Sequence, residues 1–282
     1  MNRRWITLSF AGPGALVLAL FFLTPLLVVG REGFIESGAA WGRVLKDPVF
    51  LQGLYNTLLL SITSAAFSLV VGFCVALHLS HLPENRRTAY LFLISLPLTF
   101  SGLIVAYGFI LAFGRAGFIT LLLAELGFDP ATLAGFIYSP VGLGFAYTYF
   151  LIPRVVLLLL PVLVNFDQNQ LAAAESLGAG RIKALWDVLV PQVLPTAAAA
   201  FCLVAAVALG AYGTALALVG TQVNILPLLL YSKISEAGSD FPAAAVISLI
   251  LLSLCSLIMA VAEVYASARE EKDSPGLSRY MY

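Results

Sequence analysis

Two histidines and three cysteines are the first side chains in this sequence that could bind a metal ion or act as nucleophiles. His78 and His81 are three residues apart, a spacing that places both imidazoles on one face of a helix. No carboxylate or cysteine cluster accompanies them, so we favour anchoring at a membrane surface over metal binding. Cys74, Cys202 and Cys255 lack metal-ligand spacing, and we interpret them as small buried hydrophobic side chains. We therefore expect no metal site.

Motifs for catalysis and nucleotide binding are absent from the sequence. It contains no Gly-Lys dipeptide and hence no phosphate-binding P-loop, and neither G-x-S-x-G nor H-E-x-x-H occurs. Paired carboxylates within apolar segments are also missing. The formal net charge of zero provides no basic field for nucleic acid. We therefore predict that the chain is not an enzyme, has no bound cofactor and does not bind nucleic acid.

Arg154 is the one charged residue that lies clearly inside an apolar segment of the sequence. A charge near the centre of a bilayer costs at least about 2.5–3.5 kcal/mol, and no Asp or Glu lies deep in an apolar run to pair with it. The side chain can extend to the membrane surface, bond backbone carbonyls or pair with a partner subunit. A further hypothesis is that it faces a solute pathway and attracts an anion.

A second group of candidate pathway residues follows in a later apolar run. Gly210, Gly213 and Thr214 are small, and Tyr212 lies between them. Small residues let helices approach closely, which favours a packing role over a role in the pathway. Arg154, Tyr212, Gly213 and Thr214 are nevertheless the residues we expect at a pathway, if the chain forms one.

The elements that position these residues follow from composition. Hydrophobic residues make up 61% of the 282 residues, charged residues make up 11%, and mean hydropathy is +0.98, which excludes a water-soluble enzyme and a disordered chain. A bilayer core requires about 20 consecutive helical apolar residues. We predict an all-α integral membrane protein with six transmembrane helices near residues 10–30, 54–79, 89–113, 138–164, 196–220 and 241–266.

Three details qualify this assignment. The first apolar run follows Arg3 and Arg4 as in a signal peptide, but it is too long for one and we expect it to be retained. Ala116–Ala124 is too short to cross a bilayer, so we expect an interfacial or pore-rim helix there. A β-barrel is excluded because its strands alternate in polarity, whereas these runs are apolar throughout.

The distribution of Lys and Arg predicts the orientation. Placing residues 1–9 and the tail 267–282 in the cytoplasm gives the cytoplasmic segments more basic residues than the opposite side. The transmembrane domain then covers residues 10–266. Its largest cytoplasmic connection is residues 165–195, between the fourth and fifth spans.

This connection has the pattern of two short helices. Asp167 can cap the first, with Gln170 completing a capping-box-like pair, and Gly178 is placed to end it in the left-handed conformation. A second helix is expected from Arg181 to Val190, ending at Pro191. On the pattern alone, a plain amphipathic connector between two spans is an equally acceptable interpretation.

The connection resembles the cytoplasmic motif of type I ABC importer permeases, the inner-membrane subunits of binding-protein-dependent transport systems. That motif reads Glu-Ala-Ala, three residues, Gly, nine residues, Ile, one residue, Leu-Pro. The matching positions in this chain are Ala172, Ala173, Ala174, Gly178, Val188, Val190 and Pro191. The six-span plan extends the resemblance over most of the chain. Ala172 replaces the leading Glu of the family, and Glu175 lies one helical turn later on a similar face.

The resemblance implies a mechanism and a set of partners. Residues 168–190 would form coupling helices that dock into a groove on a separate ATP-hydrolysing subunit. Ala173, Ala174 and Gly178 would permit close packing, Glu175 would supply a polar contact, and Pro191 would set a break before the fifth span.

The implied assembly contains two ATP-binding subunits that carry ATP and Mg, a second permease chain of the same or a different kind, and a periplasmic solute-binding protein. Its location would be the bacterial inner membrane, with both termini in the cytoplasm. The chain resembles most the polyamine, ferric-iron and phosphonate group of these permeases. A secondary carrier or channel without an ATPase is the competing class, and a structural membrane protein is a third.

Overall fold

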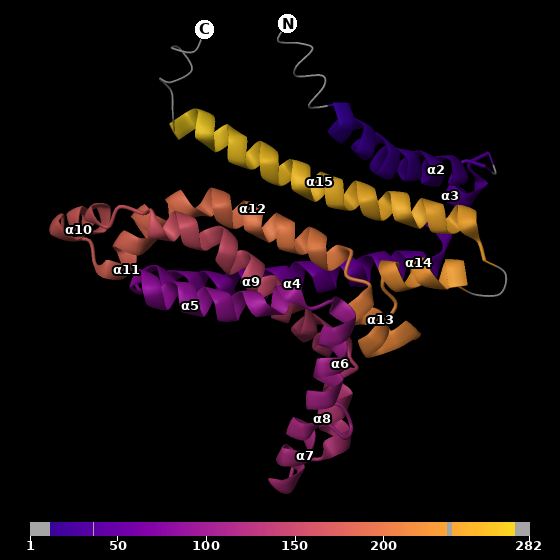
Figure 1. The fold of residues 1–282 in the computed structure, drawn as a ribbon, viewed down its shortest axis with the longest axis horizontal. Coiled ribbons are helices and arrows are strands. Elements are labelled where there is room, and N and C mark those ends of the chain that lie inside the picture. Colours follow the sequence, from indigo (N-terminus) through magenta and orange to yellow (C-terminus); the bar gives the residue numbers. More distant parts are fainter. Residues whose placement is uncertain (1–11, 36, 236–238, 274–282) are drawn as a thin grey trace, which may run out of the picture. The chain divides into compact units, whose positions relative to one another are not determined.

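The computed structural model describes residues 12–35, 37–235 and 239–273, and every regular element in this part of the chain is helical (Figure 1). Six segments are long and apolar enough to cross a membrane: Gly12–Phe34, Pro48–Ser80, Gly102–Glu125, Pro140–Val164, Arg181–Leu209 and Phe241–Val264. The prediction of an all-α membrane protein with six spanning helices is confirmed. The described residues divide into two compact units, residues 12–54 with 224–253 and residues 55–223 with 254–273.

The first unit is built around one apolar cluster. Its elements are η1 (Ala19–Leu23), α2 (Thr24–Glu32), α3 (Ala39–Lys46), α14 (Leu226–Ser235) and the first parts of α4 (Pro48–Ser80) and α15 (Phe241–Asp273). Buried side chains from four of these helices form the cluster: Ala40, Val44, Phe50, Leu226, Ala243, Val246 and Ile247. The Asn224 side-chain amide donates to the Val49 carbonyl at 2.7 Å, which ties the start of α14 to that of α4.

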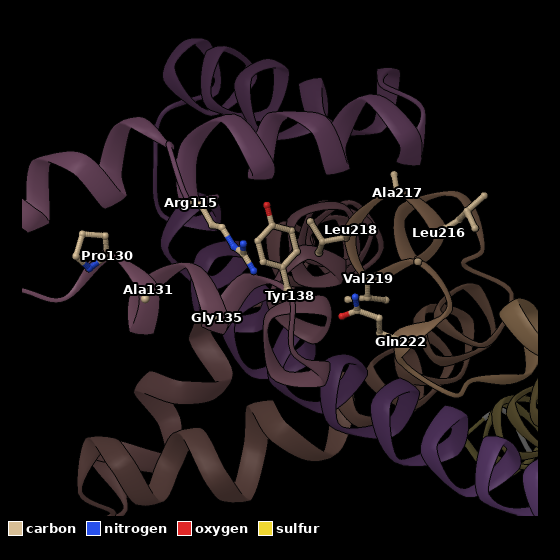
Figure 2. A pocket seen from close by; sticks show the side chains of 11 residues that line it. Arg115, Pro130, Ala131, Gly135, Tyr138, Leu216, Ala217, Leu218, Val219 and Gln222 are labelled. Carbon is tan, nitrogen blue, oxygen red and sulfur yellow. The ribbon is translucent and has the colours of Figure 1, made fainter.

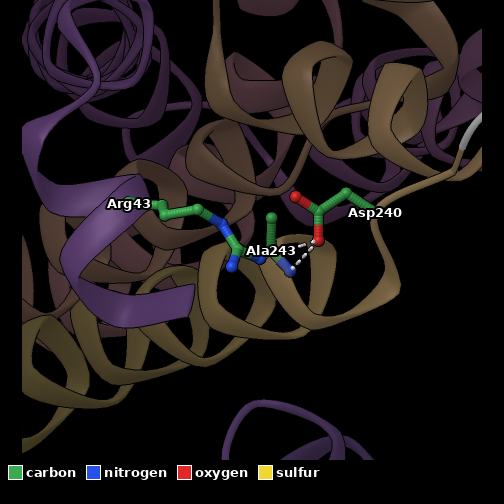
Figure 3. A network of polar contacts seen from close by, with 3 residues as sticks. All are labelled: Arg43, Asp240 and Ala243. Carbon is green, nitrogen blue, oxygen red and sulfur yellow. Dashed lines mark hydrogen bonds and ion pairs between the residues drawn. The ribbon is translucent and has the colours of Figure 1, made fainter. Parts of the chain in front are cut away.

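A polar contact fixes the start of α15 within this unit (Figure 3). The Asp240 carboxylate accepts the Ala243 backbone N–H at 3.0 Å, as a helix-capping side chain does. The same carboxylate oxygen lies 3.5 Å from the Arg43 guanidinium of α3. Both side chains are partly exposed, and such surface ion pairs contribute at most about 1 kcal/mol, so the cap is the more important contact.

The second unit contains the remaining helices. They are α5 (Glu84–Ser95), η2 (Leu96–Thr99), α6 (Gly102–Phe113), α7 (Phe118–Glu125), α8 (Pro130–Ile137), α9 (Pro140–Val164), α10 (Asn169–Ser176), α11 (Arg181–Ala184), η3 (Leu185–Leu189), α12 (Val190–Leu209), α13 (Gly213–Val219) and η4 (Gly220–Gln222), with the later parts of α4 and α15. The helix α7 falls on residues 116–124, where a helix that does not cross the bilayer was expected. It instead forms the last part of the segment Gly102–Glu125, which is long and apolar enough to cross.

The helix α9 is the central packing element of this unit. It packs along α12, and buried residues recur on its inner face, including Tyr147, Leu151, Val155 and Leu159. On another side α4 approaches closely, because a Cβ added to Gly72 would lie 2.6 Å from the Val155 side chain. The small residue therefore sets the distance between the two helices, as expected for helices that pack in a membrane.

The third predicted helix, residues 89–113, is interrupted in the structure. The helix α5 ends at Ser95, Pro97 lies in the short 3₁₀ segment η2, and Phe100 is extended before α6 begins at Gly102. Pro97 has no N–H to continue the hydrogen-bond ladder, and the Ser101 hydroxyl instead accepts the Ile104 N–H to start a new helix. The spanning segment found here is Gly102–Glu125, later than predicted.

The prediction that Pro191 ends a helix is wrong. Residues 181–209 form one continuous helical segment with Pro191 inside it. A π turn over Leu185–Leu189 precedes the proline, and the Val190 N–H bonds the Leu185 carbonyl five residues back. This wider turn is a common site of helix bending and lets the chain continue past a residue that lacks a backbone donor.

The predicted single helix over residues 196–220 is also wrong, because the break lies at its far end. The helix α12 ends at Leu209, and α13 begins at Gly213. Glycine disfavours helix interiors, and Gly210 begins the three-residue gap while Gly213 follows it. The Tyr147 hydroxyl donates to the Ala211 carbonyl at 2.7 Å, so a side chain of α9 satisfies backbone that the break leaves unpaired.

Candidate functional site

The connection between α9 and α12 contains the first candidate site. The Asp167 carboxylate accepts the Asn169 N–H at 3.0 Å and so stabilises the first turn of α10, as predicted. The predicted partner role of Gln170 in that cap is not seen. Its side-chain oxygen accepts a hydrogen bond from Gln192 at 2.6 Å, which ties α10 to the start of α12.

Gly178 ends α10 in the left-handed conformation, as the sequence predicted. Its φ is +91°, its N–H bonds the Glu175 carbonyl at 2.9 Å, and the Ala179 N–H bonds the Ala174 carbonyl at 3.1 Å. These two bonds define a Schellman motif. A Cβ at Gly178 would meet nothing within 4 Å, so the glycine is required by backbone conformation and not by space.

The predicted coupling residues occupy different faces of this loop. Ala172, Ala173, Glu175 and Gly178 are exposed, and Ala174 is half-buried. Pro191 is exposed too, within the continuous helix described above. Ala172 and Glu175 line a groove of about 740 Å³, which Leu77 and His81 at the end of α4 also line.

Three exposed apolar side chains in this loop were not predicted. Leu177 is 90% exposed, Ile182 is 75% exposed and Trp186 is 66% exposed. Leu177 lies at the end of α10, and Ile182 and Trp186 lie in the first two turns of the helical segment Arg181–Leu209. Exposed apolar side chains beside polar residues are typical of a protein–protein contact. Trp186 could have indicated this contact surface from the sequence, because tryptophan is enriched at the centres of protein–protein contacts.

The second candidate site is a cavity of about 290 Å³ in the second unit. Arg154, Gly213 and Thr214 all line it, so the structure brings together three of the four predicted pathway residues. Tyr212 is not among the lining residues. Most of the remaining wall comes from the two helix breaks, before α6 and after α12.

Arg154 is half-buried at this cavity. Its guanidinium donates to the Phe150 carbonyl one turn earlier in α9 and lies 5.5 Å from the centre of the Phe150 ring. The contact with a backbone carbonyl was one of the predicted alternatives. Among the described residues no carboxylate forms an ion pair with Arg154.

Thr214 closes one side of the cavity. Its hydroxyl donates to the Gly102 carbonyl at 3.0 Å. A Cβ added at Gly102 would lie 2.5 Å from the hydroxyl oxygen of Thr214. The contact joins the first residue of α6 to the first turn of α13. A glycine at position 102 is therefore needed for the two helix starts to meet.

A larger cavity of about 920 Å³ lies between α8 and the segment around η4 (Figure 2). Arg115 and Tyr138 project into it from one side, and Gln222 lies on the opposite side. Arg115 was not among the predicted site residues. Its neighbours come from segments about 100 residues apart, so no local pattern indicated this cavity.

The histidines and cysteines show no shared geometry. A nitrogen of the His81 ring lies 2.7 Å from the Leu77 carbonyl. No group of three or more His, Cys, Asp or Glu that could hold a metal ion occurs among the residues searched, which are those the structure describes. Cys74 is exposed, so the prediction of a buried side chain is wrong there, while Cys202 and Cys255 are half-buried.

Comparison with known proteins assigns this architecture to a family. Residues 68–270 match the family model described as "binding-protein-dependent transport system inner membrane component". The chain is 27% identical to the chloroplastic sulfate permease 2 of Chlamydomonas reinhardtii, over 90% of this chain and 68% of the relative. It is 26% identical to the spermidine/putrescine permease protein PotB of Haemophilus influenzae, over 91% and 88% of the two chains.

Two further similarities cover most of the molecule. A putative 2-aminoethylphosphonate permease protein, PhnU of Salmonella typhimurium, is 27% identical over 85% of each chain. The fold matches a chain in the crystal structure of a bacterial alginate ABC transporter with a TM-score of 0.76 and 18% identity, over 92% of this chain and 93% of that one. The family model covers well over half of the sequence, so the chain belongs to the inner-membrane components of binding-protein-dependent transport systems, the non-catalytic permease subunits of ABC importers.

Proposed function

We propose that this chain and a second permease chain together form the membrane pathway of a bacterial importer for a small polar solute. Two separate ATP-binding subunits hold ATP and Mg and supply the energy, and a periplasmic binding protein delivers the solute. Both termini lie in the cytoplasm of a cell whose inner membrane holds the complex. The family match over residues 68–270 is the observation that carries this proposal.

Residues 168–190 are the part of the chain that contacts the ATP-binding subunit. We call the exposed apolar side chains Leu177, Ile182 and Trp186 the coupling patch. Burying them against a partner is favourable, because roughly 25 cal/mol is gained for each Å² of apolar surface removed from water. The exposed Ala173 lets the partner backbone approach α10, and Glu175 supplies a charged contact beside it.

The geometry of this loop suits force transmission. The Schellman motif at Gly178 fixes the angle at which the chain leaves α10, and the Gln170–Gln192 hydrogen bond ties α10 to α12. The helix then continues without interruption from Arg181 to Leu209. A displacement of the coupling patch is therefore passed along a continuous helix to the break at residues 210–212, beside Arg154.

The names of the relatives support a small polar solute. Their printed names include sulfate, spermidine or putrescine, and 2-aminoethylphosphonate. All three are small and strongly polar, which supports a small polar solute for this chain. The cavity of about 290 Å³ is of the size expected for such a molecule.

The test is whether an ATP-binding subunit binds this chain through the loop. The chain is purified together with the products of neighbouring genes, as wild type, Gly178→Asp and Gly180→Asp. Gly180 lies two residues away with φ −64° and ψ 152°, where an aspartate side chain is suited to cap α11. We expect the Gly178 variant to release the ATP-binding subunit and the Gly180 variant to retain it. A chain that purifies alone and moves solute in response to an ion gradient would contradict the proposal.

A further inference from the structure

Arg154 combines a position inside a membrane-spanning helix with exposure to a cavity. It is the only ionisable side chain among the described residues that line the 290 Å³ cavity. It lies ten residues before the end of α9 at Val164, which is roughly 15 Å along the helix. The charge is therefore held well inside a membrane-spanning helix and beside a hollow space.

The contacts that Arg154 makes leave most of its hydrogen-bonding capacity unused. A guanidinium carries five N–H donors in a planar fork. One nitrogen donates to the Phe150 carbonyl, and one face lies over the Phe150 ring. Both contacts are made within α9 itself, and the described part of the chain provides no carboxylate to neutralise the charge.

The walls of the cavity show that it is a polar space. Two interruptions of the helical backbone meet there, at residues 96–101 and 210–212. Irregular backbone at membrane depth is stable only where other protein groups satisfy it or where it lines a water-filled cavity. Tyr147 satisfies the Ala211 carbonyl of the second break. Residues of both breaks line the cavity: Pro97, Leu98, Phe100, Gly210 and Ala211.

We propose that this cavity is a transit site for a small oxyanion and that Arg154 is the residue that recognises it. The inference rests on the proposed importer function and specifies the chemical class of its solute: a carboxylate, sulfate, phosphate or phosphonate. Two parallel N–H donors of a guanidinium match two oxygens of such a group, which gives both orientation and affinity. A cationic solute would meet an uncompensated like charge in the same space.

Thr214 and Gly102 position the site without contacting the charge. Their hydrogen bond holds the starts of α13 and α6 together at the cavity wall, and no side chain larger than hydrogen fits at position 102 without displacing Thr214. The cavity volume of about 290 Å³ is at the small end of ligand sites, which suits a small anion.

The first test measures anion binding directly and does not depend on transport. The purified complex is treated with phenylglyoxal, which modifies arginine, and the modification of Arg154 and Arg86 is followed by peptide mass spectrometry. Inorganic sulfate, inorganic phosphate and methylphosphonate are compared with chloride at equal ionic strength. We expect at least one oxyanion to slow modification of Arg154 several-fold while Arg86, exposed near the start of α5, is unaffected. Equal rates in all salts, or an Arg154 that the reagent cannot reach, would overturn the proposal.

The second test measures transport by the reconstituted importer, with its ATP-binding subunits and its binding protein. Wild type, Arg154→Gln, Arg154→Lys and the charge-matched control Arg86→Gln are compared for uptake of the solute that the binding protein carries. We expect an anionic solute, a loss of about tenfold in Arg154→Gln, a smaller loss in Arg154→Lys, and normal uptake in Arg86→Gln. Hydrolysis of ATP should persist in all four.

The possible failures are distinguishable. Unchanged uptake in Arg154→Gln, an equal loss in Arg154→Lys, or ATP-dependent uptake of a cation would each overturn the assignment of Arg154 while leaving the importer function intact. If the wild-type complex shows no ATP-dependent uptake at all, the proposed function fails, and the phenylglyoxal experiment still decides whether Arg154 binds an oxyanion.

Discussion

Replacing Gly178 by alanine isolates the contribution of one backbone conformation to coupling. At φ +91° a residue with a Cβ is raised in free energy by roughly 1–2 kcal/mol. No atom lies within 4 Å of the added Cβ, so sterics with neighbours contribute nothing and the whole effect is conformational. If the ATP-binding subunit requires the Schellman geometry, its affinity for the permease should fall about 5- to 30-fold, the factor that corresponds to this strain.

The assay is titration of the purified permease with its ATP-binding subunit, for wild type and three variants. Gly178→Asn should bind more tightly than Gly178→Ala, because asparagine adopts left-handed conformations more readily. Gly180→Ala is the matched control, since that position has φ −64° and also has open space around it. Wild-type affinity in Gly178→Ala, or equal weakening in Gly180→Ala, would show that the handedness of this residue does not matter for coupling.

Three further predictions concern packing, pH and the cavity wall. Gly72→Ala should lower the free energy of unfolding by about 1–3 kcal/mol, because the added Cβ would overlap the Val155 side chain. Adding Val155→Ala should restore much of that free energy. A denaturation series in which the double variant is no more stable than Gly72→Ala would contradict this contact. Hydrogen bonds from Thr132 and Ala131 hold the pKa of the Asp129 carboxyl below its ordinary 3.8. The carboxylate should therefore stabilise α8 above pH 3.8, and this stabilisation should vanish as pH falls through the lowered pKa. Amide exchange at the start of α8, with Asp129→Asn as reference, checks this, and equal pH responses in the two proteins would refute it. Thr214→Val should lower uptake more than Thr214→Ser, since only serine retains the hydroxyl donor; equal uptake would exclude the contact as a determinant.

The sequence predicted those features that depend on local chemistry. Six apolar helical segments follow from runs of about 20 or more uncharged residues. The left-handed cap at Gly178 and the helix start at Asp167 follow from residue type and spacing alone. Arg154 was identified because a charge in an apolar run is unusual in any membrane helix.

The features that sequence reasoning missed depend on contacts between distant segments. The helix break at residues 210–212 is stabilised by Tyr147, more than 60 residues earlier in the chain. The glycines of the apolar run alone were therefore not enough to locate the break. The helix continues through Pro191 because a π turn precedes it, and no simple residue pattern encodes that turn. Hydropathy detects length and polarity, but it does not detect where a helix is interrupted when other side chains satisfy the exposed backbone.

The solvent exposure of the coupling patch was missed for a related reason. Leu177, Ile182 and Trp186 are the kind of side chains that a sequence pattern assigns to a core. In the structure they lie on the outside of a connection between two helices. The direction in which Ile182 and Trp186 point depends on the angle between α10 and the helix that follows Gly178. The sequence indicates that a left-handed turn is allowed at Gly178, but it does not give this angle.

Solute uptake into proteoliposomes tests most directly the claim that this chain is a pathway driven by a separate ATPase. Vesicles contain the permease with or without its ATP-binding subunits, and uptake is measured with ATP inside, with a non-hydrolysable analogue, or with an imposed ion gradient alone. We predict uptake only when the ATP-binding subunits and ATP are both present and the binding protein supplies the solute. Uptake at an undiminished rate from an ion gradient, without the ATP-binding subunits, would contradict the account.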